Sequence, residues 1–241
     1  IVQRLPRDWI AGTGIYFEEA TVGSAETRNH LRSMLSANCA TIRFPTNTMS
    51  SLWPFLGPDS RRASENLPYQ GGRYEYTDAF AASLADANMT DDILFDLYME
   101  STEAAPIDMD ALFAEDRSRW QQQDGLCDVA LGDFLEHHFR ERYLFTAPDE
   151  RGGDIVREIA RQLAVGSPLQ DIFGAEQLTE ALDRLTSGWH PAPRALPVHP
   201  RVARHFGLRW WTPDMIYKVR GNDLTFRDYT LRYIRWSMWL P

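Results

Sequence analysis

Cysteine and lysine are scarce in this chain, and no long apolar run occurs. Cys39 and Cys127 are its two cysteines, too few for a disulfide framework, so we expect free thiols and a cytoplasmic protein. Lys218 is the single lysine among 25 cationic residues, and the net charge is −9. A nucleic-acid surface requires clustered cations, so nucleic acid is not an expected partner. No run of eighteen apolar residues is present, so no transmembrane helix is predicted.

Metal-ligating residues are also sparse. Around His137-His138, Asp133 and His137 are the only ligand pair of good geometry at a spacing of four, and no cluster of cysteine or histidine completes a tetrahedral set. The sequence therefore predicts no metal site, and the Asp133 and His137 pair is either a surface contact or half of a catalytic triad.

The hydrophobic content of 44% over 241 residues is that of a globular protein. Apolar spacing predicts helices over residues 25–37, 78–87, 91–100, 108–143 with a break near 124–125, 153–164, 175–185 and 228–240. Residues 40–44 are predicted as a strand, 189–200 as a proline-rich connector, and 216–226 as a hairpin. We interpret the chain as one α/β domain over residues 1–241, with a small parallel-type sheet near its N-terminus and a predominantly helical remainder.

The most informative segment follows the predicted strand. Residues 44–55 read FPTNTMSSLWPF, which is too polar for a core and too aromatic for a plain linker. A loop at a strand end is positioned by the sheet beneath it and often carries chemistry. Arg61 and Arg62 follow closely, and their guanidinium groups favour an anionic ligand.

Four segments in order resemble the WcbI-like capsular polysaccharide biosynthesis family. They are FPTNTMSSLWPF at 44–55, PYQGGRYEYTDAF at 68–80, GLCDVALGDFLEHHFRERYLFTAP at 125–148 and LPVHPRVARHFGLRWW at 196–211. The resemblance implies a bacterial coenzyme A-binding, acetyltransferase-like protein that uses acetyl-CoA to modify a sugar in capsule or exopolysaccharide assembly. This sequence departs from the family pattern in two places. The Gly-Asn-Cys-Gln turn that would carry the nucleophile is absent, so we expect a first strand and turn upstream of Ile1. Ala147-Pro148 stands where relatives show a His-Pro pair.

The resemblance also suggests roles for particular side chains. Arg61, Arg62 and Arg73, beside Gly71-Gly72, would bind the phosphates of coenzyme A. Asn47 and Ser51 would donate hydrogen bonds to an oxyanion or a sugar hydroxyl. Trp53 and Tyr76 would stack on a sugar or adenine ring, although Trp53 is equally well interpreted as a core anchor. Asp78 would support the site. His199, held between Pro197-Val198 and Pro200, is either a general base or a packed, hydrogen-bonded residue that shapes a rigid loop.

Three readings of the function follow. The first is an O-acetyltransferase. The second is a non-catalytic component that binds a glycan or nucleotide-sugar, for which the missing nucleophile turn is the main argument. A glycosyltransferase is weaker, because no Asp-x-Asp stands at a strand end to hold a divalent metal. Aromatic residues near the C-terminus predict either a packing face or a contact in a homo-oligomer; they are Trp210, Trp211, Tyr229, Tyr233, Trp236 and Trp239.

Overall fold

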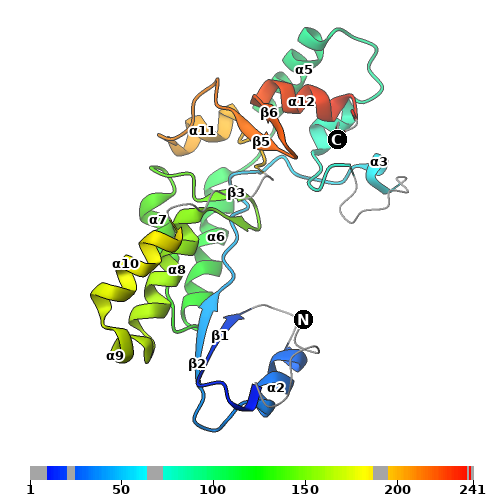
Figure 1. Cartoon of the computed structure of the whole chain (residues 1–241). Helices are drawn as coiled ribbons and strands as arrows, with labels where there is room; N and C mark the ends of the chain where they lie inside the picture. The colour runs from blue at the N-terminus through cyan, green and yellow to red at the C-terminus, as the bar shows by residue number, and fades with distance from the viewer. Residues whose placement is uncertain (1–9, 21–24, 64–72, 187–194, 238, 240–241) are drawn as a thin grey trace. The chain divides into compact units, whose positions relative to one another are not determined.

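The computed structural model describes residues 10–20, 25–63, 73–186, 195–237 and 239 (Figure 1). The chain divides into two compact units, each assembled from three stretches of sequence. The first comprises residues 1–48, 115–139 and 151–191, and the second comprises residues 49–114, 140–150 and 192–241.

The first unit contains the parallel sheet that the sequence predicts. Strand β1 (Ile15–Ala20) pairs with β2 (Ala40–Pro45) in parallel, with Ile15 opposite Ala40 and Ala20 opposite Pro45. Helix α2 (Ala25–Met34) lies between them in sequence. Arg32 on α2 donates from Nε to the carboxylate of Glu18 over 2.9 Å, which satisfies a charge that is only 3% exposed on β1. The α/β class and the β2 prediction are therefore confirmed, whereas β1 was not foreseen.

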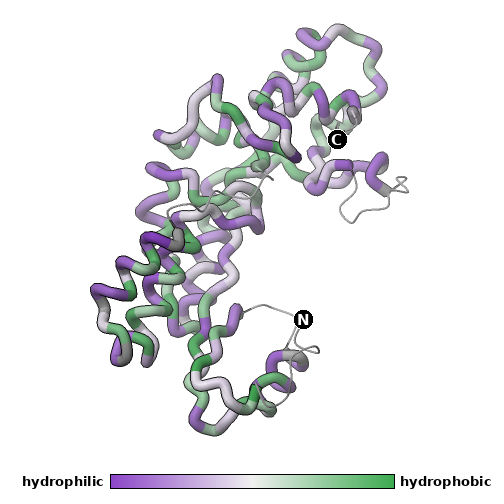
Figure 2. Tube along the Cα trace, viewed as in Figure 1, coloured by the Kyte–Doolittle hydropathy of each residue, from purple (hydrophilic) through white to green (hydrophobic). Residues whose placement is uncertain are grey.

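The remainder of the first unit is helical. It contains α7 (Gly132–His138), α8 (Gly153–Val165), α9 (Leu169–Phe173) and α10 (Ala175–Thr186), together with the second half of α6 (Met109–Asp124). Helices α8 and α10 are amphipathic, with apolar and polar residues interspersed along each of them (Figure 2). The two helices pack against each other. The predicted break near 124–125 is confirmed. Asp124 accepts hydrogen bonds from the backbone amides of Leu131 and Gly132 at 2.8 and 2.7 Å, and so supports the start of α7.

The second unit combines short helices with two small sheets. Its helices are α3 (Ser60–Ala63), α4 (Ala79–Ser83), α5 (Asp91–Ala104), α11 (Pro200–Phe206) and α12 (Phe226–Ile234). Strand β3 (Phe145–Ala147) pairs with β4 (Glu150–Arg151), whose last residue belongs to the first unit, and β5 (Tyr217–Val219) pairs with β6 (Asn222–Leu224) in a hairpin. The predicted hairpin is confirmed with a shorter turn. Part of the predicted connector, residues 187–194, lies outside the described residues.

The predicted C-terminal helix over 228–240 is wrong at both ends. Helix α12 begins earlier because Thr225 and Asp228 form a capping box. It stops at Ile234, and Trp236 then adopts a positive φ of 52°. Trp236 nevertheless packs on Tyr74, with ring centroids 5.1 Å apart. The aromatic residues of this region therefore form an internal packing face, and the predicted homo-oligomer contact stays a prediction.

Candidate functional site

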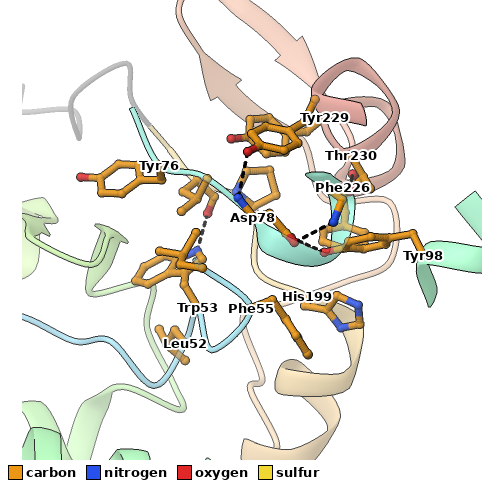
Figure 3. A pocket seen from close by; sticks show the side chains of 15 residues that line it. Leu52, Trp53, Phe55, Tyr76, Asp78, Tyr98, His199, Phe226, Tyr229 and Thr230 are labelled. Carbon is orange, nitrogen blue, oxygen red and sulfur yellow. Dashed lines mark hydrogen bonds between the residues drawn. The ribbon is translucent and has the colours of Figure 1, made fainter. Parts of the chain in front are cut away.

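A pocket in the second unit gathers side chains from loops and helices that are far apart in sequence (Figure 3). The cavity volume is about 40 Å³, and the figure rises to about 460 Å³ only when the open solvent space at the mouth is counted. Its walls are mostly aromatic and aliphatic; the lining residues are Leu52, Trp53, Phe55, Leu56, Tyr76, Asp78, Ala81, Tyr98, Leu196, Pro197, His199, Phe226, Tyr229, Thr230 and Tyr233. This composition is that of a binding pocket for a small organic group.

Three of the four segments that carry the family resemblance line this pocket, and the segment at 125–148 is joined to two of them by backbone hydrogen bonds. The indole Nε1 of Trp53 donates to the carbonyl of Leu196 over 3.0 Å. The amide of Leu196 donates to the carbonyl of Thr146 over 2.7 Å, and the amide of Met49 donates to the carbonyl of Pro148 over 2.8 Å. Because these bonds join backbone at residues 49, 146, 148 and 196, the pocket walls are fixed by loops rather than by one continuous sheet. Trp53 is thus a core anchor, as the alternative interpretation held, and it also lines the pocket.

Asp78 is the one carboxylate among the lining residues. It caps α4, accepting through Oδ1 from the amides of Phe80 and Ala81 at 2.9 and 3.0 Å. Its Oδ2 accepts from the phenol of Tyr98 over 2.7 Å, as the dashed lines of Figure 3 show. Burial raises the pKa of Asp78 above its ordinary value, against the lowering effect of these three hydrogen bonds.

His199 caps α11 from the other side of the pocket. Its Nδ1 accepts from the amide of Arg201 over 3.0 Å, so the proton of the neutral ring must be on Nε2. Nε2 lies 2.9 Å from Oγ1 of Thr102, whose hydroxyl in turn donates to the carbonyl of Tyr98. Burial, together with the charges of Arg204 and Arg201, lowers the pKa of His199 to about 3. Both nitrogens are therefore occupied, and this arrangement favours the packed interpretation over the general base.

The three arginines predicted to bind phosphate do not converge on the pocket. Arg61 donates from Nε and Nη2 to the carboxylate of Asp59 and from Nη1 to the carbonyl of Ile234. Its guanidinium also lies 4.3 Å from the ring centroid of Trp236. Burial alone would raise the pKa of Asp59, but the hydrogen bonds from Arg61 and Tyr233 outweigh it and hold that pKa below its ordinary value. A phosphate would have to compete with this buried carboxylate, which argues against the phosphate role at Arg61.

Arg62 and Arg73 are placed differently. Arg62 is exposed and donates one hydrogen bond, over 2.7 Å, to the carbonyl of Glu75. Arg73 is half-buried and donates to the carbonyl of Trp236. Neither lines the pocket. Of the three, Arg62 is the one whose exposure leaves room for a phosphate. Gly71 and Gly72 lie outside the described residues.

The remaining predicted residues separate between the two units. Tyr76 lines the pocket and donates its phenol to Asp149. Ser51 is fully buried in the second unit and does not line the pocket. Asn47 belongs to the first unit, two residues beyond β2, and is 1% exposed. Both polar atoms of its carboxamide lack a hydrogen-bond partner among the described residues. Neither unit therefore contains all three of Asn47, Ser51 and His199, and their predicted grouping stays a prediction.

Sequence reasoning missed several residues that complete the pocket. Tyr98, Phe226, Tyr229, Thr230 and Tyr233 line it from α5 and α12. Tyr233 joins two parts of the site, because its phenol donates to Asp59 over 2.7 Å and accepts from the amide of Asp78 over 3.0 Å. The spacing of four between Tyr229 and Tyr233 was the available signal, and it indicates a shared helix face without naming what that face lines.

The cysteines belong to the first unit and are not among the residues that line this pocket. Cys39 and Cys127 are both free and half-buried, which confirms the predicted thiols. Burial raises the pKa of Cys127 above its ordinary value. Within the described part of the chain, no three His, Cys, Asp or Glu side chains are grouped as a metal site would require. No helix there combines the length and apolarity needed to span a bilayer.

Comparisons with known proteins agree with the resemblance. The family model described as "Polysaccharide biosynthesis enzyme WcbI" matches residues 2–168. A solved structure of WcbI superposes with a TM-score of 0.64 at 18% sequence identity, covering 94% of this chain and 74% of that one. That protein is described as a novel polysaccharide biosynthesis enzyme, in native form without a disulfide bond between coenzyme A and one of its cysteines. No curated protein sequence matches significantly. At this identity the superposition shows the fold, and the family match covers well over half of the chain. The chain therefore belongs to the WcbI family of polysaccharide biosynthesis enzymes.

Proposed function

We propose that this protein binds coenzyme A and transfers an acetyl-type group from its thioester to a sugar hydroxyl in capsule or exopolysaccharide assembly. The observation that carries the proposal is family membership over residues 2–168, together with the fold of a WcbI that is described with coenzyme A. The reaction requires a thioester site, a group to accept the proton of the attacking hydroxyl, and donors for the oxyanion.

The pocket around Trp53, Tyr76 and Asp78 is proposed as the site of the uncharged end of the cofactor. None of its lining residues is Lys or Arg, so the phosphates would lie outside it, and Arg62 is the proposed phosphate contact. His199 would hold the pocket wall in place and leave proton transfer to another group. The orphaned carboxamide of Asn47 supports a separate role for that residue as an oxyanion donor.

The test begins with titration calorimetry of coenzyme A against the purified chain. Coenzyme A is expected to bind the wild type, and Arg62→Gln should bind it about fivefold more weakly because the charged contact to a phosphate is gone. The same substitution should weaken the binding of dephospho-coenzyme A by a smaller factor. Arg227→Gln is a control, since Arg227 is a half-buried arginine that is paired with Asp92 and does not line the pocket. Failure of coenzyme A to bind at millimolar concentration overturns the proposal.

A second candidate is a non-catalytic component that binds the same cofactor or a nucleotide-sugar. It is favoured by one observation: no cysteine or serine is among the described residues that line the pocket, and the hydroxyl of Thr230 is already donated to the carbonyl of Phe226 over 2.9 Å. Thiol release from acetyl-CoA, followed across a panel of sugar acceptors, separates the two. Acceptor-dependent release supports the enzyme, and binding without release supports the component.

A further inference from the structure

An open cleft beside α4, also in the second unit, is far roomier than the candidate pocket. Its volume is about 640 Å³, against about 40 Å³ for the pocket. That volume lies within the range of about 300–1,000 Å³ that is usual for small-molecule sites. We call it the α4 cleft; its lining residues are Pro58, Asp59, Ser60, Arg61, Ala79, Ala82, Ser83, Ala85 and Asp86.

The two walls of the α4 cleft are held together by close backbone contacts. A Cβ added at Gly57 would lie 2.9 Å from the Cβ of Ala79, so a side chain at this position would push the walls apart. The amide of Gly57 donates to the carbonyl of Thr77 over 2.8 Å, and the hydroxyl of Thr77 donates back to the carbonyl of Gly57 over 2.6 Å. The cleft is therefore preformed, and a ligand would not have to order its walls.

The lining of the α4 cleft combines small apolar surfaces with polar groups. The ring of Pro58 and the methyl groups of the alanines on and after α4 supply the apolar part. The hydroxyl of Ser60 and the carboxylate of Asp86 are exposed, and neither has a hydrogen bond or ion pair with another residue that the structure describes. Both can therefore bind a ligand without breaking a contact within the described residues. A sugar ring matches this lining, because it has apolar C–H faces and a rim of hydroxyls that donate and accept.

The charges that line the α4 cleft disfavour a phosphate. Arg61 is already paired with Asp59, with Nη2 2.7 Å from Oδ2, so these two charges offset each other. Asp86 is then the one lining charge without a partner among the described residues, and it is negative. An anionic ligand would be repelled by this carboxylate, whereas the hydroxyls of an uncharged sugar can donate hydrogen bonds to it.

The α4 cleft shares a wall with the candidate pocket. Tyr233 lines the pocket, and its phenol donates to the carboxylate of Asp59, which lines the cleft. Asp78 of the pocket is followed directly by Ala79 of the cleft. We infer that the α4 cleft binds an uncharged sugar unit and is the acceptor site of this protein. The sugar-binding part stands on the cleft itself, and the acceptor role rests on the proposed function.

Ligand-observed NMR titrations test the sugar site without coenzyme A. The probes are the methyl glycosides of glucose, galactose, mannose and N-acetylglucosamine, each compared with the 1-phosphate of the same sugar. At least one methyl glycoside should bind, and its 1-phosphate should bind about fivefold more weakly because of the charge of Asp86. If no glycoside binds at millimolar concentration, or if the phosphates bind more tightly, the inference is overturned. If glycosides bind as expected but coenzyme A does not bind, the sugar site stands and the proposed function fails.

Two pairs of variants locate the binding. Ala82→Leu fills the cleft from α4 and should weaken glycoside binding at least about tenfold, whereas Ala104→Leu, at an exposed position on α5 outside the cleft, should not. Asp86→Asn keeps a hydrogen-bonding group and removes the charge, so the fivefold preference for the glycoside over its phosphate should disappear. Asp96→Asn, at an exposed position on α5, is its control. Circular dichroism should show the same fold in all four variants, and equal responses within either pair contradict the assignment.

Discussion

Replacing His199 by asparagine should remove a large part of the acid sensitivity of this fold. In the folded chain the imidazole is 3% exposed, accepts from the amide of Arg201 and donates to Thr102. Its pKa of about 3 lies well below the ordinary histidine value of about 6.5. Between these two values the unfolded chain binds a proton that the folded chain does not, so stability rises with pH through this window and falls on acidification.

The magnitude follows from the two pKa values. Lowering the pH from 7.0 to 4.5 should cost the wild type about 2.5 kcal/mol through His199 alone. Asparagine is a good N-cap and does not titrate, so it keeps the acceptor for the Arg201 amide and loses this dependence. The variant is expected to be less stable at neutral pH, because it loses ring contacts to Phe55 and Phe226 at 4.5 and 5.0 Å.

The assay is urea unfolding followed by tryptophan fluorescence at pH 7.0 and 4.5. The quantity compared is the change in unfolding free energy between the two pH values, because other groups, including Asp59, titrate in both proteins and cancel. His137→Asn, at an exposed position on α7, is the matched control and should behave as the wild type. An equal acid loss in His199→Asn and wild type would refute the buried neutral imidazole. Imidazole NMR at pH 6 should show the proton on Nε2.

Two further predictions concern the polar contacts around the pocket. In a double-mutant cycle, Asp78→Ala and Tyr98→Phe should be coupled by about 1–2 kcal/mol in urea unfolding, because each leaves the other's buried hydrogen-bonding group unpaired; additive effects would contradict that bond. Arg61→Ala should destabilise by about 2–4 kcal/mol, because Asp59 is left buried without its cation. Arg62→Ala should stay within about 0.5 kcal/mol, and similar losses in the two variants would contradict the different roles.

Much of the fold could be predicted where a single segment determines its own structure. Strand β2 was recognised from residues 40–44 and its stop at Pro45, and α8 from its apolar spacing. Helix α11 was not, because Pro197 and Pro200 suggested a connector. Pro200 instead occupies the first turn of a helix, where its missing amide costs nothing, and His199 supplies the cap.

Some residues of the candidate pocket could also be recognised from the sequence, whereas the predicted functional roles stay predictions. Trp53, Tyr76, Asp78 and His199 were recognised individually from their loops, and the structure places all four around one pocket. The close spacing of Asp59 and Arg61 is visible in the sequence, but it does not show that the pair is buried, because that burial involves Tyr233 and Ile234, more than 170 residues away in sequence. Long-range pairing of this kind leaves no local pattern. The local sequence around a loop arginine does not indicate whether its guanidinium binds a ligand or a buried carboxylate.

The chain passes between its two units five times, at 48/49, 114/115, 139/140, 150/151 and 191/192. During synthesis on a ribosome neither unit can therefore be finished before a late part of the chain emerges. The wall that contains Phe226, Tyr229 and Tyr233 is translated long after Trp53 and Asp78, so these two residues leave the ribosome well before their surroundings exist. A nascent chain stalled before α12 should accordingly bury neither the tryptophan nor the carboxylate, and holding such intermediates soluble becomes a task for chaperones.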